Sequence, residues 1–156
     1  MPFAEVIAMT ELRNIDDTNK NEVIMLAVAD SQRPYIASNQ ASLETAEKNP
    51  AVARPFAIYA EDQLVGFTMF AFDTEYDDPN DRYWLWRFMI DKKFQGKGYG
   101  AAALEKVIAY FRDHNAGYIK LSTKESNLTA LSLYHKYGFK ENGEWNGEEV
   151  VLKRNL

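Results

Sequence analysis

The spacing of hydrophobic residues predicts a strand followed by two helices in the first third of the chain. Residues 5–13 (EVIAMTELR) have the pattern of a strand, and residues 16–30 place apolar side chains at helical spacing behind an Asp or Thr cap. Residues 31–39 show no clear period and are expected to form a loop. A short helix is expected over residues 40–49, because Pro50 cannot continue it.

Three strands are predicted in the middle of the chain. Residues 55–61 and 64–72 are rich in β-branched and aromatic side chains, and the short polar stretch between them favours a tight hairpin. Residues 82–90 (RYWLWRFMI) carry apolar side chains at both odd and even positions, which is typical of a central strand covered on both faces. The stretch between, residues 73–81, is acidic, contains Pro79 and is expected to be a loop.

The last third of the chain alternates helices and strands. A helix over residues 99–114 carries one apolar stripe, and residues 118–123 predict a strand. A second helix, residues 127–138, begins at an Asn cap and ends at a Gly. Residues 139–154 form a predicted hairpin that turns at an Asn-Gly pair. We therefore expect one mixed α/β domain spanning residues 1–156, with about seven strands and about four helices.

Composition narrows the class of protein. The chain has 156 residues, of which 46% are hydrophobic and 26% charged, as in ordinary globular domains. No apolar run is long enough for a membrane span, and the N-terminus lacks the basic start and apolar core of a signal peptide. The absence of cysteine excludes disulfides, thiolate metal sites and a cysteine nucleophile. A cytoplasmic location is the simplest expectation.

The net charge of −5 argues against nucleic acid as a partner, because nucleic-acid binders usually carry a basic excess. An acidic protein can attract a cationic partner, although a modest negative charge also serves solubility alone. His114 and His135 lie far apart with no obvious ligand partners, so no metal site is expected.

A glycine-rich turn between the central strand and the long helix is the most informative feature. Glycines 96, 98 and 100 alternate with Lys97 and Tyr99 immediately before the helix. Such a turn exposes backbone N–H groups next to the positive end of the helix dipole and suits a phosphate or diphosphate. It is neither a Walker A loop, since no Ser or Thr follows the Lys, nor a dinucleotide fingerprint, which requires G-x-G-x-x-G.

Gln95-Gly96-Lys97-Gly98-Tyr99-Gly100 resembles the Q/R-x-x-G-x-G/A loop that binds the acetyl-CoA diphosphate in the GNAT superfamily of N-acetyltransferases. Residues 126–139 (SNLTALSLYHKYGF) resemble a second motif of that family. Residues 81–100 and the C-terminal hairpin look like those of bacterial spermine/spermidine (diamine) acetyltransferases. The resemblance implies a mostly antiparallel sheet that splays apart at the cofactor, and acetyl-CoA as co-substrate.

The resemblance also assigns roles to individual residues. It gives Tyr134 the role of proton donor to the departing CoA sulfur, on the same helix face as the cap residue Asn127. The strand before the turn supplies backbone hydrogen bonds to the pantetheine arm and the acetyl oxygen. The expected cofactor-binding residues are Phe88, Met89, Ile90, Gln95, Gly96, Lys97, Gly98, Tyr99, Gly100 and Asn127. Tyr134 is alternatively a core aromatic residue, and Lys97 either neutralises a phosphate or is a solvated turn charge.

The base that deprotonates the amine has no match in this chain at the position that the resemblance gives. At neutral pH the neutral form of a primary amine costs about 4.6 kcal/mol, so a base is useful. Diamine acetyltransferases place a carboxylate in the central strand, whereas this chain has Trp86 at the matching position, followed by Arg87. We favour Glu75 as the base, with Tyr76, Asp77, Asp78 or a water relay as alternatives. The same loop, with Trp86, is the expected acceptor site: Glu75, Tyr76, Asp77 and Asp78.

Three functions remain open from the sequence. The first is acetylation of a small cationic polyamine such as spermidine or spermine by direct attack of the neutral amine on the thioester. The second is acetylation of another amine, such as an aminoglycoside, a peptide N-terminus or a lysine. The third is an acyl-CoA-binding sensor without activity, which the loss of the strand carboxylate keeps open. By resemblance alone, we also expect a homodimer. The net charge and the lack of a long apolar run lead us to expect neither a nucleic-acid nor a membrane partner.

Overall fold

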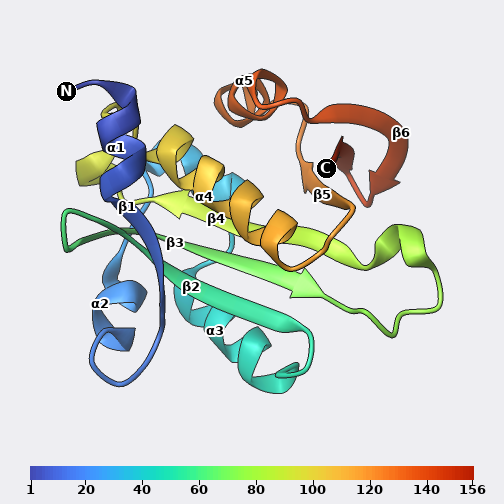
Figure 1. The fold of residues 1–156 in the computed structure, drawn as a ribbon, viewed down its shortest axis with the longest axis horizontal. Helices are drawn as coiled ribbons and strands as arrows, with labels where there is room; N and C mark the ends of the chain where they lie inside the picture. Colours follow the sequence, from blue (N-terminus) through green and yellow to red (C-terminus); the bar gives the residue numbers. More distant parts are fainter.

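Seven strands form one sheet that is antiparallel except for the pairing of β4 with β5. The computed structural model describes all residues 1–156 (Figure 1). The sheet has the strand order β1-β2-β3-β4-β5-β7-β6. The strands are β1 (Thr10–Asn14), β2 (Ala53–Ala60), β3 (Gln63–Phe72), β4 (Tyr83–Ile90), β5 (Tyr118–Thr123), β6 (Lys140–Asn146) and β7 (Glu149–Asn155). The prediction of one mixed α/β sheet of about seven strands is therefore confirmed.

Five α-helices and three short 3₁₀ helices connect the strands. The α-helices are α1 (Phe3–Met9), α2 (Lys20–Met25), α3 (Asn39–Lys48), α4 (Tyr99–Asp113) and α5 (Leu128–Lys136). The 3₁₀ helices are η1 (Asp30–Tyr35), η2 (Pro79–Asp81) and η3 (Lys92–Phe94). None of the helices has both the length and the apolar character that crossing a bilayer requires.

The helices cover the sheet from two sides. α4 packs a stripe that includes Leu104, Val107 and Phe111 into the larger core, which also holds residues of β3, β5, α5 and β7. α2 and α3 cover the opposite face, where Val23 and Leu43 pack on β2 and β3 (Figure 1). The apolar stripe predicted from the helical period of residues 99–114 is thus the face that α4 buries.

Local turn chemistry explains where most elements begin and end. The β2–β3 hairpin turns at Glu61 and Asp62, which both have positive φ, as the right-handed twist of the flanking strands favours. α5 begins at Asn127, whose side chain accepts a hydrogen bond from the Ala130 N–H. It is followed by Gly138, which has φ +84°.

The N-terminal third differs from its prediction. Residues 5–13 are not one strand: they contain most of helix α1 and only the start of β1. Val6 is buried in α1, and the Thr10 hydroxyl donates to the Val6 carbonyl at the junction. The expected helix over residues 16–30 is also short, because it ends at Met25, and η1 follows. Tertiary packing of single residues, rather than a long amphipathic period, decides both segments.

Strands β4 and β5 splay apart, and this opening positions the site. They pair through Trp84 and Lys120 only. Beyond that pair, the β4 edge from Leu85 to Ile90 has no strand beside it. The splayed sheet expected from the family resemblance is therefore present.

Candidate active site

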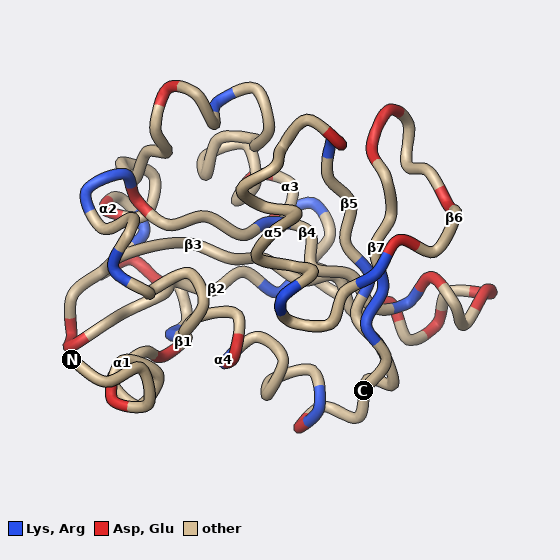
Figure 2. Tube along the Cα trace, turned by 90° about the horizontal axis from the view of Figure 1, so that it is seen from above, with Lys and Arg blue, Asp and Glu red and all other residues tan.

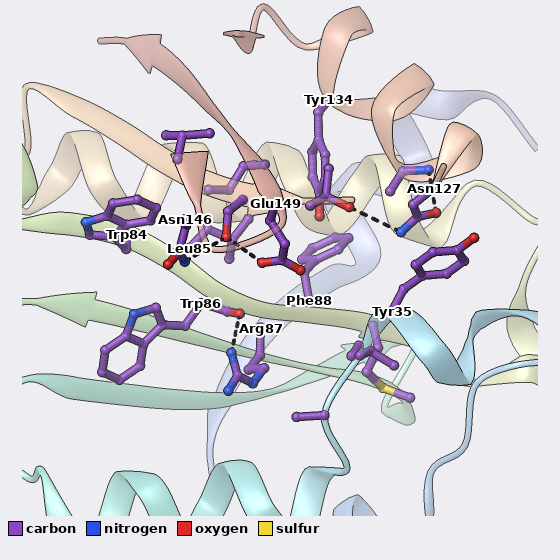
Figure 3. A pocket seen from close by; sticks show the side chains of 18 of the residues that line it. Tyr35, Trp84, Leu85, Trp86, Arg87, Phe88, Asn127, Tyr134, Asn146 and Glu149 are labelled. Atoms are coloured by element: carbon purple, nitrogen blue, oxygen red, sulfur yellow. Dashed lines mark hydrogen bonds between the residues drawn. The ribbon is translucent and has the colours of Figure 1, made fainter. Parts of the chain in front are cut away.

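One large cavity of about 1010 Å³ lies in the opening between β4 and β5. Its wall on one side is β4, and on the other side it is formed by β5, α5 and β7 (Figure 3). It runs along β4 from the loop that follows β3 to the glycine turn that precedes α4. Ile90 lies six positions beyond Trp84 along β4, so the two ends lie about 20 Å apart at the usual rise of about 3.3 Å per residue.

A β-bulge at Trp86 shapes the β4 wall. Met69 of β3 pairs with Arg87 and the next residue, Phe70, pairs with Leu85, which leaves Trp86 as the extra residue. Leu85 packs into the α4 core, whereas Trp86 packs against the α2–α3 core. Arg87 is directed to the same side, where its Nε donates to Ser42 of α3 at 3.1 Å. The side chains of Trp86 and Arg87 therefore both lie on the face of β4 opposite α4, and both border the cavity.

The glycine turn presents a run of free backbone donors. None of the N–H groups from Gln95 to Ala101 donates a hydrogen bond within the protein, and the first helical bond comes from Ala102 to the Gly98 carbonyl. Gly96 and Gly98 have φ +76° and +86°, with open space where a Cβ would lie. Backbone N–H groups at a helix N-terminus stabilise anions such as phosphate. The residues present therefore fit a diphosphate.

Gln95 holds this turn in place. Its Nε2 donates to the Ile90 carbonyl at 2.9 Å and to Gln32 Oε1 of η1 at 2.8 Å. The side chain therefore ties the turn to the end of β4 and to the segment that covers the cavity. The glutamine of the motif thus has a structural role that the sequence did not reveal.

Most of the predicted cofactor residues border the same cavity. Those that line it are Phe88, Met89, Ile90, Gln95, Gly96, Gly100 and Asn127. Gly98 and Tyr99 belong to the turn but not to the lining, and the Lys97 ammonium lies 5.9 Å from the centre of the Phe94 ring. Asn127 Nδ2 donates to Thr123 Oγ1 at 3.4 Å, so this residue both caps α5 and borders the cavity.

Tyr134 projects from α5 into the cavity toward Phe88 (Figure 3). Its ring packs in the core beside Phe139, and the residue is only 9% exposed. The hydroxyl makes no hydrogen bond within the protein. Every fully buried polar side-chain atom does have a partner, so the Tyr134 oxygen is not fully buried and is open to the cavity. Burial raises the pKa of the Tyr134 phenol well above its ordinary value. The group therefore stays protonated at neutral pH and can act as an acid.

The other end of the cavity is acidic. The acidic side chains that line the cavity are Asp73, Asp81, Glu144 and Glu149, and none belongs to the glycine turn. Figure 2 shows acidic residues gathered at the end of the molecule formed by β6, β7 and the β3–β4 loop. Buried Lys120 forms ion pairs with Asp81 at 2.9 Å and with Glu144 at 3.1 Å. These two pairs hold the loop after β3 against β5 and β6.

The predicted acceptor residues divide into two groups. Tyr76 and Trp86 line the cavity. Glu75, Asp77 and Asp78 are exposed and do not line it. Asp78 instead caps η2, where its carboxylate accepts from the Asn80 N–H at 2.9 Å.

Glu149 is the cavity residue that sequence reasoning missed. It begins β7, is half-buried, and accepts a hydrogen bond from Ser122 Oγ at 2.8 Å. Its carboxylate lies between Tyr134 and β4 (Figure 3). Burial lowers the pKa of the Arg87 guanidinium, and the negative charge of Glu149 opposes that shift. No sequence signal marks Glu149, because a hairpin far along the chain brings it to β4.

No group of His, Cys, Asp or Glu side chains is arranged to hold a metal ion. Residues 30–139 match the model of the acetyltransferase (GNAT) family. The chain belongs to the GNAT family. It is an acetyl-CoA-dependent N-acetyltransferase, and the glycine turn and splayed strands are the features expected to bind this co-substrate.

Two relatives align with this chain over nearly its whole length. The chain is 39% identical over 147 residues to a probable spermine N(1)-acetyltransferase of Bacillus subtilis subsp. natto, covering 91% of this chain and 96% of the relative. It is 38% identical, with the same coverage, to the spermine/spermidine N(1)-acetyltransferase of Bacillus subtilis strain 168.

A solved structure shares the fold at lower identity. The spermidine N-acetyltransferase of Vibrio cholerae, solved with CoA and spermine, superposes with a TM-score of 0.69 at 20% identity. The match covers 94% of each chain.

Proposed function

We propose that this GNAT enzyme transfers the acetyl group of acetyl-CoA to a primary amine of a polyamine such as spermidine or spermine. The observation that carries the proposal is the charge distribution in one continuous cavity. Free N–H groups lie at one end, and carboxylates with Tyr76 and Trp84 lie at the other. An anionic cofactor and a cationic acceptor would therefore enter from opposite ends and meet between them.

On the cofactor side, the diphosphate binds the turn from Gln95 to Gly100. The pantetheine arm then follows the unpaired edge of β4, whose backbone from Phe88 to Ile90 has no strand beside it. Rigid backbone N–H groups on that edge polarise the thioester carbonyl and stabilise the oxyanion that forms on attack. In this proposal the acyl carbon lies near Phe88, opposite Tyr134, whose side chain projects toward Phe88 (Figure 3).

Tyr134 protonates the leaving thiolate in this proposal. The amine nitrogen attacks the carbonyl carbon, the C–N bond forms, and the C–S bond breaks as the Tyr134 O–H gives its proton to sulfur. The burial that raises the pKa of Tyr134 also disfavours a bare thiolate in the same cavity, so protonation of sulfur accompanies bond cleavage.

On the acceptor side, an elongated polycation suits the acidic end better than a compact or anionic acceptor does. Each exposed ion pair contributes only about 0–1 kcal/mol, so several carboxylates must act together. Aromatic rings add a cation–π surface for ammonium groups. The two Bacillus relatives are named as spermine or spermine/spermidine acetyltransferases, and the Vibrio enzyme was solved with spermine, which agrees with this acceptor class.

The test is the release of CoA from acetyl-CoA in the presence of spermidine, spermine, an aminoglycoside or a lysine peptide. The proposal expects the highest kcat/KM with the polyamines. Faster turnover of the aminoglycoside or the peptide would show that the acceptor is not a polyamine but belongs to the class of the faster substrate. Tight binding of acetyl-CoA without thiol release from any amine would instead indicate a sensor.

A further inference from the structure

We propose that the carboxylate of Glu149 is the general base that removes the proton from the acceptor amine. This inference rests on the proposed function, because it concerns the amine that attacks the thioester. Related diamine acetyltransferases are expected to carry the base on the central strand, where this chain has Trp86. The cavity nevertheless contains a carboxylate in the opening beside β4, which is that of Glu149 at the start of β7.

The register of the sheet places Glu149 in the opening between β4 and β5. These two strands pair only at Trp84 and Lys120, and β7 pairs Val150 with Thr123, so Glu149 lies just beyond the last paired residue of β5. Glu149 accepts its hydrogen bond from Ser122. Val150 and Leu152 of β7 pack into the α4 core, so Glu149 faces the other side of the sheet, as Trp86 and Arg87 do.

The remaining acidic residues of the cavity are less suited to the role. Asp81 and Glu144 are both occupied by ion pairs with Lys120. Asp73 follows β3 and hydrogen-bonds through its backbone to Arg82, at the far end of β4 from the thioester. Glu149 is in no ion pair and lies between Tyr134 and β4 (Figure 3).

A short chain of hydrogen bonds aims the Glu149 carboxylate. Asn146 Nδ2 donates to Ser122 Oγ at 3.2 Å, and Ser122 Oγ donates to Glu149 Oε1 at 2.8 Å. No hydrogen bond within the protein reaches Oε2. One oxygen is therefore held, and the other is available to accept a proton from the amine.

Several charged or titratable groups share the cavity with Glu149. Arg87 approaches from β4, Tyr134 from α5, and the Lys120-bound Glu144 from β6. Tyr76 and Asp73 belong to the loop after β3, and Tyr35 to η1. Arg87 supplies the nearby positive charge, and its guanidinium is already hydrogen-bonded to Ser42 and to the Trp86 carbonyl.

The proton balance of the step is complete with these groups. The ammonium form of the substrate gives one proton to Glu149, and the neutral nitrogen attacks the acyl carbon. The C–S bond breaks while Tyr134 gives its proton to sulfur, and the nitrogen loses its second proton to the Tyr134 oxygen. Glu149 then releases its proton to solvent, so the reaction yields an amide, CoA thiol and one proton.

Glu149→Gln tests the proposal, with Glu148→Gln as a matched control. Glu148 is the exposed neighbour of Glu149 and does not line the cavity. kcat/KM is measured over a pH range that ends near the ordinary amine pKa of about 10.4. We expect Glu149→Gln to lose about 10²- to 10⁴-fold at neutral pH, because general-base catalysis contributes about that much.

The loss in Glu149→Gln should shrink as the pH rises, because solution then supplies the neutral amine without a base. Glu148→Gln should follow the wild-type profile throughout. Glu149→Asp, which keeps a carboxylate on a shorter side chain, should recover part of the activity. Acetyl-CoA affinity and melting temperature of all variants should stay near the wild-type values, because the glycine turn is unchanged.

Three results would overturn the proposal. These are a loss in Glu149→Gln that is equal at every pH, a rise in KM with kcat unchanged, and a pH-dependent loss in Glu75→Gln instead. The variants are assayed with whichever amine the wild type acetylates best. A wrong acceptor class therefore shows in the wild-type panel, and a wrong base shows in the pH profiles.

Discussion

The two ends of the cavity are built from different parts of the chain. The glycine end consists of backbone N–H groups from Gln95 to Ala101, which are contiguous in sequence and held by one turn and one helix start. The acidic end consists of side chains from the β3–β4 loop, β6 and β7, which lie far apart in sequence. One end is therefore fixed by local backbone geometry, and the other by tertiary packing.

This difference separates the general part of the enzyme from the specific part. Backbone N–H donors can bind a diphosphate whatever acyl acceptor is used, because they interact only with the charge and shape of the anion. Side chains at the acidic end can be exchanged one at a time without altering the turn. The identity of the acceptor should therefore depend on few residues, each with a small contribution, whereas cofactor binding should fail as a unit.

Apart from Glu149, the largest effect is expected between the two ends, at Tyr134. Tyr134→Phe should lower kcat about 10²-fold or more, because it removes the proposed proton transfer to the thiolate. Since the hydroxyl makes no hydrogen bond within the protein, its removal leaves no protein group without a partner. Steady-state kinetics and calorimetric titration with acetyl-CoA are the measurements, and the affinity for acetyl-CoA should be retained.

Tyr137→Phe is the matched control for Tyr134→Phe. Tyr137 follows α5 directly, is half-buried and does not line the cavity. Its variant should keep wild-type kcat. Unchanged turnover in Tyr134→Phe would show that the thiolate leaves without this proton donor.

The glycine end should respond strongly to a single methyl group. Gly98→Ala adds a Cβ at φ +86°, a conformation that costs an L-residue about 1–2 kcal/mol. Relief of this strain should rotate the peptide groups that are proposed to bind the diphosphate, so the Kd for acetyl-CoA should rise about tenfold, as about 1.4 kcal/mol requires. The KM for the amine should not change.

Gly143→Ala separates strain from cofactor binding. Gly143 lies in β6, also with φ +86° and open space around a Cβ, and it does not line the cavity. The melting temperature should fall by a similar amount in both variants, whereas only Gly98→Ala should bind acetyl-CoA more weakly. Equal affinity loss in the two variants would mean that the turn does not carry the diphosphate.

The contrast between the ends also explains what the sequence could predict. The turn, the Asn127 cap and the α4 stripe are local patterns, and each appears in the structure at the predicted residues. Tyr134 and the splayed strands followed from family resemblance rather than from any period in the sequence. The bulge at Trp86 was not predicted, because it is a property of pairing with β3.

Long-range contacts account for the remaining differences. Glu149 reaches the cavity only because β7 pairs with β5, and no pattern around residue 149 indicates that. Conversely, Glu75, Asp77 and Asp78 form a conspicuous acidic run in sequence, yet the structure directs them to solvent. At the N-terminus, α1 was missed because a seven-residue helix with one buried residue shows too little periodicity to be recognised.

A smaller effect is expected at the acidic end, where the structure distinguishes two aspartates. Asp73 lines the cavity and is half-buried, whereas Asp77 is exposed and outside the lining. Asp73→Asn should raise the KM for a polyamine by up to about fivefold, as about 1 kcal/mol allows, and Asp77→Asn should raise it less. The difference should diminish at high salt because exposed charges are screened. A larger effect of Asp77→Asn would place the distal ammonium group in the outer loop.

The smallest effect is expected outside both ends, at the pair formed by His135 of α5 and Glu141 of β6. The hydrogen bond from His135 lowers the pKa of Glu141 in the folded protein. The pair therefore stabilises the folded state above the pKa that Glu141 has in the unfolded chain. This stabilisation is lost as the pH falls through the lower pKa of Glu141 in the folded protein. Both side chains are about half exposed, so Glu141→Gln should cost no more than about 1 kcal/mol near pH 6. The melting temperature of Glu141→Gln should be lower by at most about 4 °C near pH 6, and the melting temperatures of the variant and the wild type should become equal in acid.

Kinetic constants for both substrates should be unchanged in Glu141→Gln, since neither His135 nor Glu141 lines the cavity. A changed KM for either substrate would show that this outer pair helps to set the spacing between α5 and β6, and through it the two ends of the cavity.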